Sequence, residues 1–127
     1  MRVTVVGCAG SFPGPDSPAS CYLVEHEGSS LLLDLGNGAF GALQRYADVY
    51  AVDAIALSHL HADHCLDLTS YYVARKYHPD GPKPTIPVLG PTGTADRMAR
   101  AYDLPHEPGM HGEFEFREHV EVTEIGP

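Results

Sequence analysis

The chain has 127 residues, of which 43% are hydrophobic and 20% are charged, a composition that fits one globular domain and excludes collagen and intrinsic disorder. Its 8 Lys and Arg residues against 17 Asp and Glu residues give a net charge of −9, which argues against nucleic-acid binding through phosphate neutralisation alone. No apolar run approaches the ~18 residues of a membrane span, and three cysteines are too few for a disulfide framework, so we expect a cytoplasmic protein without a membrane partner.

Strands are predicted to alternate with helices, with glycine and proline marking the turns between them. The proline-rich segment Cys8–Ser20 is predicted to be a loop, and Glu27-Gly28-Ser29 a hairpin turn. The run Leu31–Leu35 predicts a buried strand, because it lacks the alternation of a half-exposed one. In chain order the predicted strands are Val3–Val6, Cys21–Glu25, Leu31–Leu35, Ala54–Ser58, Thr85–Leu89, Glu113–Arg117 and Val120–Ile125, and the predicted helices are Ala39–Ala47, one that Asp67 caps and His78-Pro79 ends, and Thr94–Tyr102.

The central predicted helix carries aromatic and basic residues that have structural interpretations. Tyr71, Tyr72 and Tyr77 could stack on a base, but aromatic residues at helical spacing more often belong to the core or an interface. Arg75, Lys76 and Lys83 are interpreted as a solvated helix end that offsets the helix dipole. Neither set is therefore assigned to a binding site.

The segment with the most chemical content is Ser58-His59-Leu60-His61-Ala62-Asp63-His64, which directly follows a predicted strand. Three of the eight histidines fall within these residues. In an extended segment, residues two apart point to the same side, so His59 and His61 can both bind one metal ion. Asp63 and His64 follow where the chain turns, and we expect them to face a second ion. Two zinc-class ions about 3.5–4 Å apart can activate water and stabilise the leaving oxygen of a phosphodiester or an acyl compound.

The histidine motif and the glycine-rich turn near the N-terminus also have other interpretations. A histidine-rich loop without metal and a structural zinc clip are the simpler alternatives, but a structural site usually uses cysteines and closes at four ligands, whereas only Cys65 follows the motif. Gly7 and Gly10 suggest a dinucleotide-binding turn, yet the prolines that follow exclude the helix such a site needs. We favour a hydrolytic motif for two metal ions, which would also supply the positive charge that a phosphate substrate requires.

The motif resembles that of the metallo-β-lactamase (MBL) superfamily, whose members carry His-x-His-x-Asp-His after a strand of an αββα sandwich. The segment Asp34-Leu35-Gly36 is similar to the superfamily's Asp-x-Gly strand end. The resemblance covers nearly the whole chain and favours the phosphodiesterase branch of the superfamily, in its actinobacterial form. This branch includes RNase Z, the tRNA 3′-processing endonuclease, and enzymes that cleave cyclic nucleotides. The branch is indicated by three further segments, Val5–Ser11, Ser20–Val24 and Val88–Pro91, and the actinobacterial form by Gly14–Ser20, Gly41–Arg45 and Ser58–Leu68.

The resemblance implies roles for individual residues. His59 and His61 would bind one Zn²⁺ ion and Asp63 and His64 a second, with Mn²⁺ or another divalent ion as substitutes. Asp63 would also be the catalytic proton acceptor, and Asp34 would support the metal ligands from outside the coordination sphere. The expected activity is hydrolysis of a small phosphodiester, with cyclic nucleotides as the first substrate class and tRNA 3′ ends as the second.

Members of the superfamily continue well beyond this length and draw further metal ligands from their second half. We therefore expect residues 1–127 to form the N-terminal half of an MBL-like domain, an α/β structure with one mixed sheet and helices on one face. His119 is interpreted as an exposed polar residue, because it precedes a predicted strand where the superfamily's third histidine follows one.

The absence of the second half is expected to affect both metal binding and the exposure of the sheet. With at most two ligands per ion, the chain alone should be inactive. Its bare sheet face should be covered by the missing C-terminal half or by a second copy in a homodimer. The alternative of another class is a non-catalytic half that serves as a dimerisation or binding module.

Overall fold

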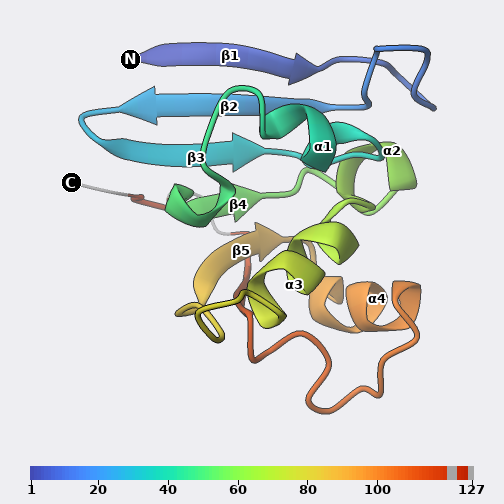
Figure 1. The fold of residues 1–127 in the computed structure, drawn as a ribbon. Coiled ribbons are helices and arrows are strands. Elements are labelled where there is room, and N and C mark those ends of the chain that lie inside the picture. Colours follow the sequence, from blue (N-terminus) through green and yellow to red (C-terminus); the bar gives the residue numbers. More distant parts are fainter. Residues whose placement is uncertain (120–122, 126–127) are drawn as a thin grey trace.

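The computed structural model describes residues 1–119 and 123–125, which form a six-stranded sheet with helices packed on one face (Figure 1). The strands follow one another across the sheet in chain order. The predicted fold class, one mixed α/β sheet with helices on one face, is confirmed. The strands are β1 Arg2–Gly7, β2 Cys21–His26, β3 Ser29–Leu33, β4 Ala54–Ala56, β5 Ile86–Gly90 and β6 Phe114–Glu118.

The sheet is antiparallel in its first part and parallel in its second. β1, β2 and β3 pair antiparallel, and the predicted hairpin turn joins β2 to β3 through Glu27 and Gly28, both at positive φ. From β3 to β6 every pairing is parallel. Because β1 also runs in the direction of β3, five strands end at the same side of the sheet, to the right in Figure 1, which we call the carboxyl edge.

The helices are α1 Ala39–Leu43, α2 Ala62–Cys65, α3 Leu68–Lys76 and α4 Thr94–Ala101, with a short 3₁₀ segment η1 at Val49–Ala51. The predicted helix Ala39–Ala47 ends early, because the chain enters turns after Leu43. Asp67 precedes α3 as predicted, but its side chain does not cap that helix. Its Oδ2 accepts a hydrogen bond from the Phe40 N–H at 2.9 Å and so ties α1 to the start of α3.

The hydrophobic core lies between the sheet and the helices. Leu23, Leu32, Ile55 and Val88 are register partners on successive strands, and all four are fully buried. Alternation along each strand places them on the helix-covered face. Buried side chains from the helices meet them there, among them Leu43, Leu68, Tyr71, Tyr72 and Met98.

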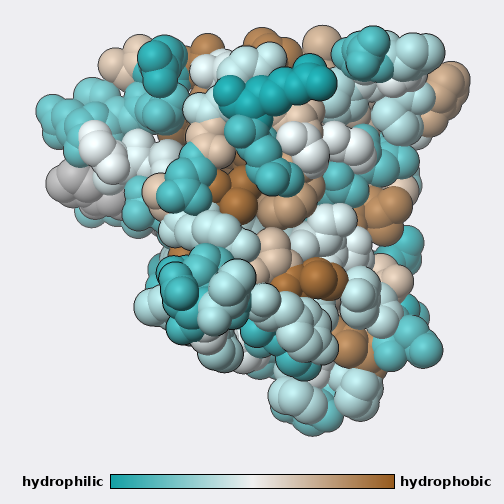
Figure 2. All heavy atoms as spheres, viewed as in Figure 1, coloured by the Kyte–Doolittle hydropathy of each residue, from teal (hydrophilic) through white to brown (hydrophobic). Residues whose placement is uncertain are grey.

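The opposite face of the sheet is partly exposed. Val3, Val5 and Leu33 keep 55%, 53% and 40% of their surface exposed. The predicted buried strand Leu31–Leu35 is therefore confirmed only in part. β3 spans Ser29–Leu33, and Leu33 is exposed because helices cover one face, which agrees with the expected bare sheet face. Ile125 lies near this face, where it lines a hollow of about 110 Å³ with Val24 and Leu31. The helix-covered face in Figure 2 is mostly hydrophilic, with hydrophobic residues scattered among the polar ones.

Three further predictions are corrected by the structure. Tyr77 does not belong to the core, because it follows the last residue of α3 and is 68% exposed. Arg75 is not a solvated helix end: it is 2% exposed, and its Nη2 donates to the Pro84 carbonyl in the segment between α3 and β5. The predicted strand Val120–Ile125 falls partly on residues 120–122, which lie outside the described residues, and residues 123–125 do not form a strand. Within the described residues, no helix is long and apolar enough to cross a bilayer.

Candidate metal centre

The histidine motif lies at the carboxyl edge, where β4 ends and α2 begins. His59 follows β4 by three residues, and His61 is the extended residue that precedes α2. The imidazole centroid of His59 lies 4.8 Å from that of His61 and 4.1 Å from that of His64. The structure thus brings three of the predicted ligands together. Helix α2, which sequence patterns did not predict, turns Asp63 and His64 back toward this edge.

The Asp34 side chain forms hydrogen bonds to two residues of the motif segment. It follows β3 directly and has a φ of 62°, a left-handed conformation that only a minority of non-glycine residues adopt. Its Oδ2 lies 2.7 Å from Nδ1 of His64, and its Oδ1 accepts the Ser58 N–H at 2.7 Å. The Ser58 hydroxyl, which donates to Asp34 Oδ2 at 2.9 Å, also lies 3.1 Å from Nδ1 of His59. One carboxylate therefore orients His64 directly and His59 through Ser58.

Ser58 is a site residue that the sequence interpretation missed. It stands next to the first histidine and is the first polar residue after the buried end of β4. That position is a signal that it can reach the end of the neighbouring parallel strand, where Asp34 lies.

Asp63 is held by the loop between β1 and β2, which also ends at the carboxyl edge. The Ser11 N–H donates to Oδ2 of Asp63 at 3.0 Å, and Ser11 itself has a φ of 69°. Desolvation raises the pKa of Asp63, but the Ser11 N–H and the imidazoles of His64 and His61 together hold that pKa below its ordinary value. The Asp63 carboxylate is therefore ionised at neutral pH.

The backbone of the motif is fixed by the neighbouring strands. The Ser20 N–H donates to the Asp63 carbonyl at 3.1 Å, and the Leu35 N–H donates to the His64 carbonyl at 2.8 Å. Gly36 packs so closely that a Cβ there would lie 2.1 Å from the Asp63 carbonyl oxygen. The glycine of the Asp34-Leu35-Gly36 segment is therefore required for this close approach.

The side chains gathered here are of the types that bind a zinc-class ion, but there are too few of them for two ions. Three imidazoles and one carboxylate are donors that Zn²⁺ takes, and each site needs three or four ligands. Here Nε2 of His64 lies 3.1 Å from Oδ2 of Asp63, so these two donors face each other. Among residues 1–119 and 123–125, no three His, Cys, Asp or Glu side chains are arranged to hold a metal ion.

His119 lies close to the motif but is not arranged as a ligand. It directly follows β6, so the expected contrast with the superfamily's third histidine, which also follows a strand, is wrong. The strand expected after it begins at residues 120–122, outside the described residues. Its backbone N–H donates to the Gly90 carbonyl at 3.0 Å, and its Nε2 lies 2.6 Å from the Leu57 carbonyl oxygen. His119 is exposed, as predicted, and its ring links the ends of β4 and β6.

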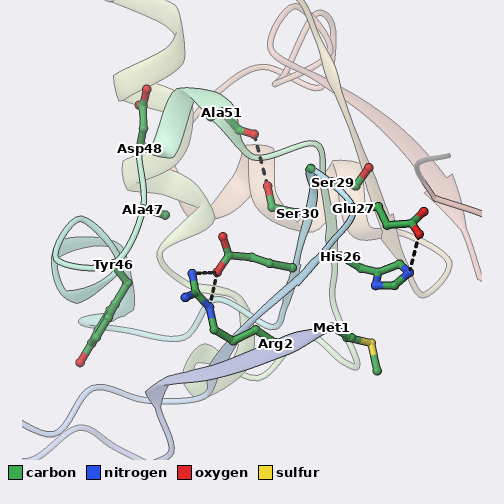
Figure 3. A pocket seen from close by; sticks show the side chains of 12 residues that line it. Met1, Arg2, His26, Glu27, Ser29, Ser30, Tyr46, Ala47, Asp48 and Ala51 are labelled. Atoms are coloured by element: carbon green, nitrogen blue, oxygen red, sulfur yellow. Dashed lines mark hydrogen bonds and ion pairs between the residues drawn. The ribbon is translucent and has the colours of Figure 1, made fainter.

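A separate hollow of about 490 Å³ lies at the other end of the strands, near the β2–β3 turn (Figure 3). In its lining, Arg2 Nη2 lies 2.9 Å from Glu25 Oε1, and Nε2 of His26 lies 3.8 Å from Oε1 of Glu27. Ser30 donates its hydroxyl to the Ala51 carbonyl across the hollow. None of the motif histidines lines it, so we do not assign it to the candidate centre.

Comparisons with known proteins agree with this geometry. An uncharacterized protein of Mycobacterium tuberculosis is 50% identical over 102 residues, 80% of this chain and 37% of that protein. The MBL-fold protein YhfI of Bacillus subtilis is 31% identical over 87% of this chain and 46% of its own length. Its crystal structure aligns with a TM-score of 0.76, over 93% of this chain and 46% of that chain. The short form of human tRNase Z aligns with a TM-score of 0.73 at 27% identity, over 94% of this chain and 45% of that chain.

The chain spans less than half the length of each of these relatives. A family profile described as "Metallo-beta-lactamase superfamily" matches residues 14–127, which include the histidine motif and all strands after β1. The chain therefore belongs to the metallo-β-lactamase superfamily, a superfamily of metallo-hydrolases.

Proposed function

We propose that this chain provides one side of the active site of a metal-dependent phosphodiesterase, with cyclic nucleotides as its first substrate class. The observation that carries the proposal is the joint position of His59, His61 and His64 at the carboxyl edge, with the Asp34 carboxylate 2.7 Å from His64. A carboxylate behind a ligating histidine fixes its tautomer and orientation, which is a usual support of a metal site.

In this proposal His59 and His61 would hold one Zn²⁺ ion, and Asp63 and His64 would hold a second, with Mn²⁺ or another divalent ion as a substitute. Such ions supply Lewis acidity that activates water and offsets the charge of the phosphate. The residues of the chain orient this site. Asp34 holds His64, Ser58 holds His59, and the Ser11 N–H holds the Asp63 carboxylate, which we assign as the proton acceptor.

We further propose that residues 1–127 are the N-terminal half of the catalytic domain and are inactive alone. Two ligands per ion are fewer than a zinc site requires. The exposed side chains of Val3, Val5 and Leu33 give the bare sheet face an apolar character that favours a cover. The cover is either the C-terminal part of the same domain or a second copy of this half, and in both cases it completes the ligand set.

RNase Z-like cleavage of tRNA 3′ ends is the second candidate activity. The likeness to human tRNase Z supports it, at 27% identity over nearly the whole of this chain. The net charge of −9 favours the smaller substrate, because RNA binding usually uses a basic stripe or arm. A non-catalytic module that binds a partner through the bare sheet face is the alternative of another class.

These candidates are separated by assaying the product of the whole gene with Zn²⁺ or Mn²⁺ on cyclic AMP, a p-nitrophenyl phosphodiester and a precursor tRNA. We expect turnover of cyclic AMP, and a loss of about 10³-fold in kcat for H59A and D63A. The matched control is H26A, because His26 is an exposed histidine at the opposite edge. Unchanged turnover in H59A and D63A contradicts the dimetal assignment. Absence of turnover on all three substrates favours the non-catalytic module.

A further inference from the structure

The loop that contacts Asp63 carries an exposed aromatic side chain. Phe12 is 73% exposed, although it is one of only four phenylalanines in the chain. A single exposed aromatic residue is ordinary on a protein surface. Phe12 differs in its position: it adjoins Ser11, whose N–H donates to the Asp63 carboxylate at 3.0 Å. Consecutive Cα atoms are about 3.8 Å apart, so the Phe12 backbone lies directly beside the residue that holds the Asp63 carboxylate.

The backbone on both sides of Phe12 is fixed by hydrogen bonds. The Phe12 N–H donates to the Gly10 carbonyl at 2.8 Å, and the Ala9 N–H donates to the Pro18 carbonyl at 3.0 Å, which closes the loop. Ser11 keeps a left-handed φ of 69°, a conformation that costs free energy for a residue with a Cβ and persists only when surrounding contacts enforce it. The loop therefore presents Phe12 at a defined place relative to Asp63, and little further ordering is needed for binding.

We propose that Phe12 is a stacking platform for the nucleobase of the substrate, which makes it a specificity-determining residue of the site. This inference rests on the proposed phosphodiesterase function. A nucleotide phosphodiester joins an anionic phosphate to a planar ring through one sugar. The chain places an exposed aromatic residue directly after Ser11, which contacts Asp63 of the metal-ligand cluster. Phenylalanine has no hydrogen-bonding group, so the platform accepts every base and favours purines through their larger stacking area.

Fluorescence tests the proposal without relying on hydrolysis. The chain contains no tryptophan, so F12W introduces a single tryptophan whose emission reports on stacking. The matched control is Y77W, because Tyr77 is 68% exposed and follows α3, which leads away from the carboxyl edge. Both variants are titrated with AMP, cyclic AMP and ribose 5-phosphate, in the presence and absence of Zn²⁺.

We expect saturable quenching of F12W by AMP and cyclic AMP, with no saturable quenching by ribose 5-phosphate and none in Y77W. In the product of the whole gene, loss of the ring in F12A should raise KM for cyclic AMP by about 5- to 150-fold and leave kcat nearly unchanged, because stacking contributes to substrate binding equally before and during the reaction. F12Y, which keeps an aromatic face, should restore KM to within about threefold of the unmodified protein.

The outcomes separate this inference from the function on which it rests. If the enzyme hydrolyses phosphodiesters but nucleotides do not quench F12W, the stacking role is wrong and the phosphodiesterase stands. If nucleotides quench F12W saturably while no phosphodiester is cleaved, nucleobase binding is supported and the hydrolytic function fails. An F12W emission that shifts to the blue as protein concentration rises, without ligand, would show that a second copy covers Phe12, and it would overturn the proposal.

Discussion

The Asp34 carboxylate accepts hydrogen bonds from both the backbone N–H and the hydroxyl of Ser58, while its Oδ2 lies 2.7 Å from Nδ1 of His64. One side chain thus joins the end of β3 to the end of β4 and to α2. The left-handed φ of 62° at Asp34 allows this, because it turns the chain at the strand end and aims the carboxylate under the motif.

The variant D34N tests this relationship. Asparagine tolerates a left-handed φ, so the turn should persist, but its amide cannot accept all three contacts at once. We expect the affinity for Zn²⁺ to fall by about 10- to 100-fold, measured by competition with a chelator. D53N is the matched control, because Asp53 accepts the Ser30 N–H at the other end of the strands. Equal Zn²⁺ affinities of D34N and the unmodified protein would refute the supporting role of Asp34.

Gly36 is predicted to be indispensable for the position of the motif. In G36A the new Cβ would lie 2.1 Å from the Asp63 carbonyl oxygen and 2.7 Å from the Ala19 Cβ. Because backbone cannot yield as a flexible side chain can, we expect a loss of at least about 3 kcal/mol in the free energy of unfolding, measured in urea. The control G41A places its Cβ in open space within α1 and should instead stabilise by about 0.5–1 kcal/mol. Similar stabilities of the two variants would contradict the packing argument.

The raised pKa of Asp67 predicts how the free energy of unfolding changes with pH. Burial raises the pKa of Asp67, and the N–H groups of Phe40 and Gly38 offset this only in part. The folded state therefore binds the proton more tightly than the unfolded state, whose pKa is about 3.9. Stability from this group is present below the unfolded pKa and falls as the pH rises through the folded pKa.

The variant D67N removes this titration and leaves an amide oxygen to accept from Phe40. We expect the stability of D67N relative to the unmodified chain to increase as the pH rises from about 3 through the folded pKa of Asp67, and to level off above it. Urea unfolding at several pH values measures this difference. A difference that stays constant over the whole range would show that the Asp67 pKa is not raised.

The three cysteines should differ in their reactivity. Burial, with smaller contributions from nearby carboxylates, raises the pKa of Cys21 to about 12, and burial raises that of Cys65 to about 11, whereas Cys8 is exposed in the loop between β1 and β2. The thiolate is the reactive form, so iodoacetamide at mildly alkaline pH should modify only Cys8 in the native protein and all three cysteines in guanidinium. Mass spectrometry counts the adducts, and rapid native labelling of Cys65 would contradict the burial of this last residue of α2.

The elements that sequence patterns predicted well are those with strong local signals. The strands β1, β2, β5 and β6 and the helices α3 and α4 lie within about two residues of their predicted bounds, because β-branched runs, proline and glycine mark them. The carboxyl-edge position of the histidine motif follows from its place directly after an apolar strand. Resemblance to a known superfamily added the association of Asp34 with the motif, which spacing alone does not reveal.

Features that depend on distant contacts could not be predicted. Helix α2 has only four residues and therefore no periodicity to detect. Arg75 has the sequence appearance of a solvated helix end, yet the segment before β5 folds over it and supplies the Pro84 carbonyl. The contact of Ser11 with Asp63 joins residues 52 positions apart, so only the completed sheet brings them together.

The two backbone hydrogen bonds that Asp63 and His64 accept, from Ser20 and Leu35, bear on how the proposed site would take up metal. In zinc fingers the ion organises an otherwise unfolded chain, and chelators denature the protein. Here the β-sheet scaffold itself holds the ligand-bearing backbone. In the proposed site, metal uptake would require the Asp63 and His64 side chains to rotate apart and the covering half to add the remaining ligands. Chelation should then abolish the activity of the product of the whole gene reversibly, while its tertiary structure and melting behaviour survive.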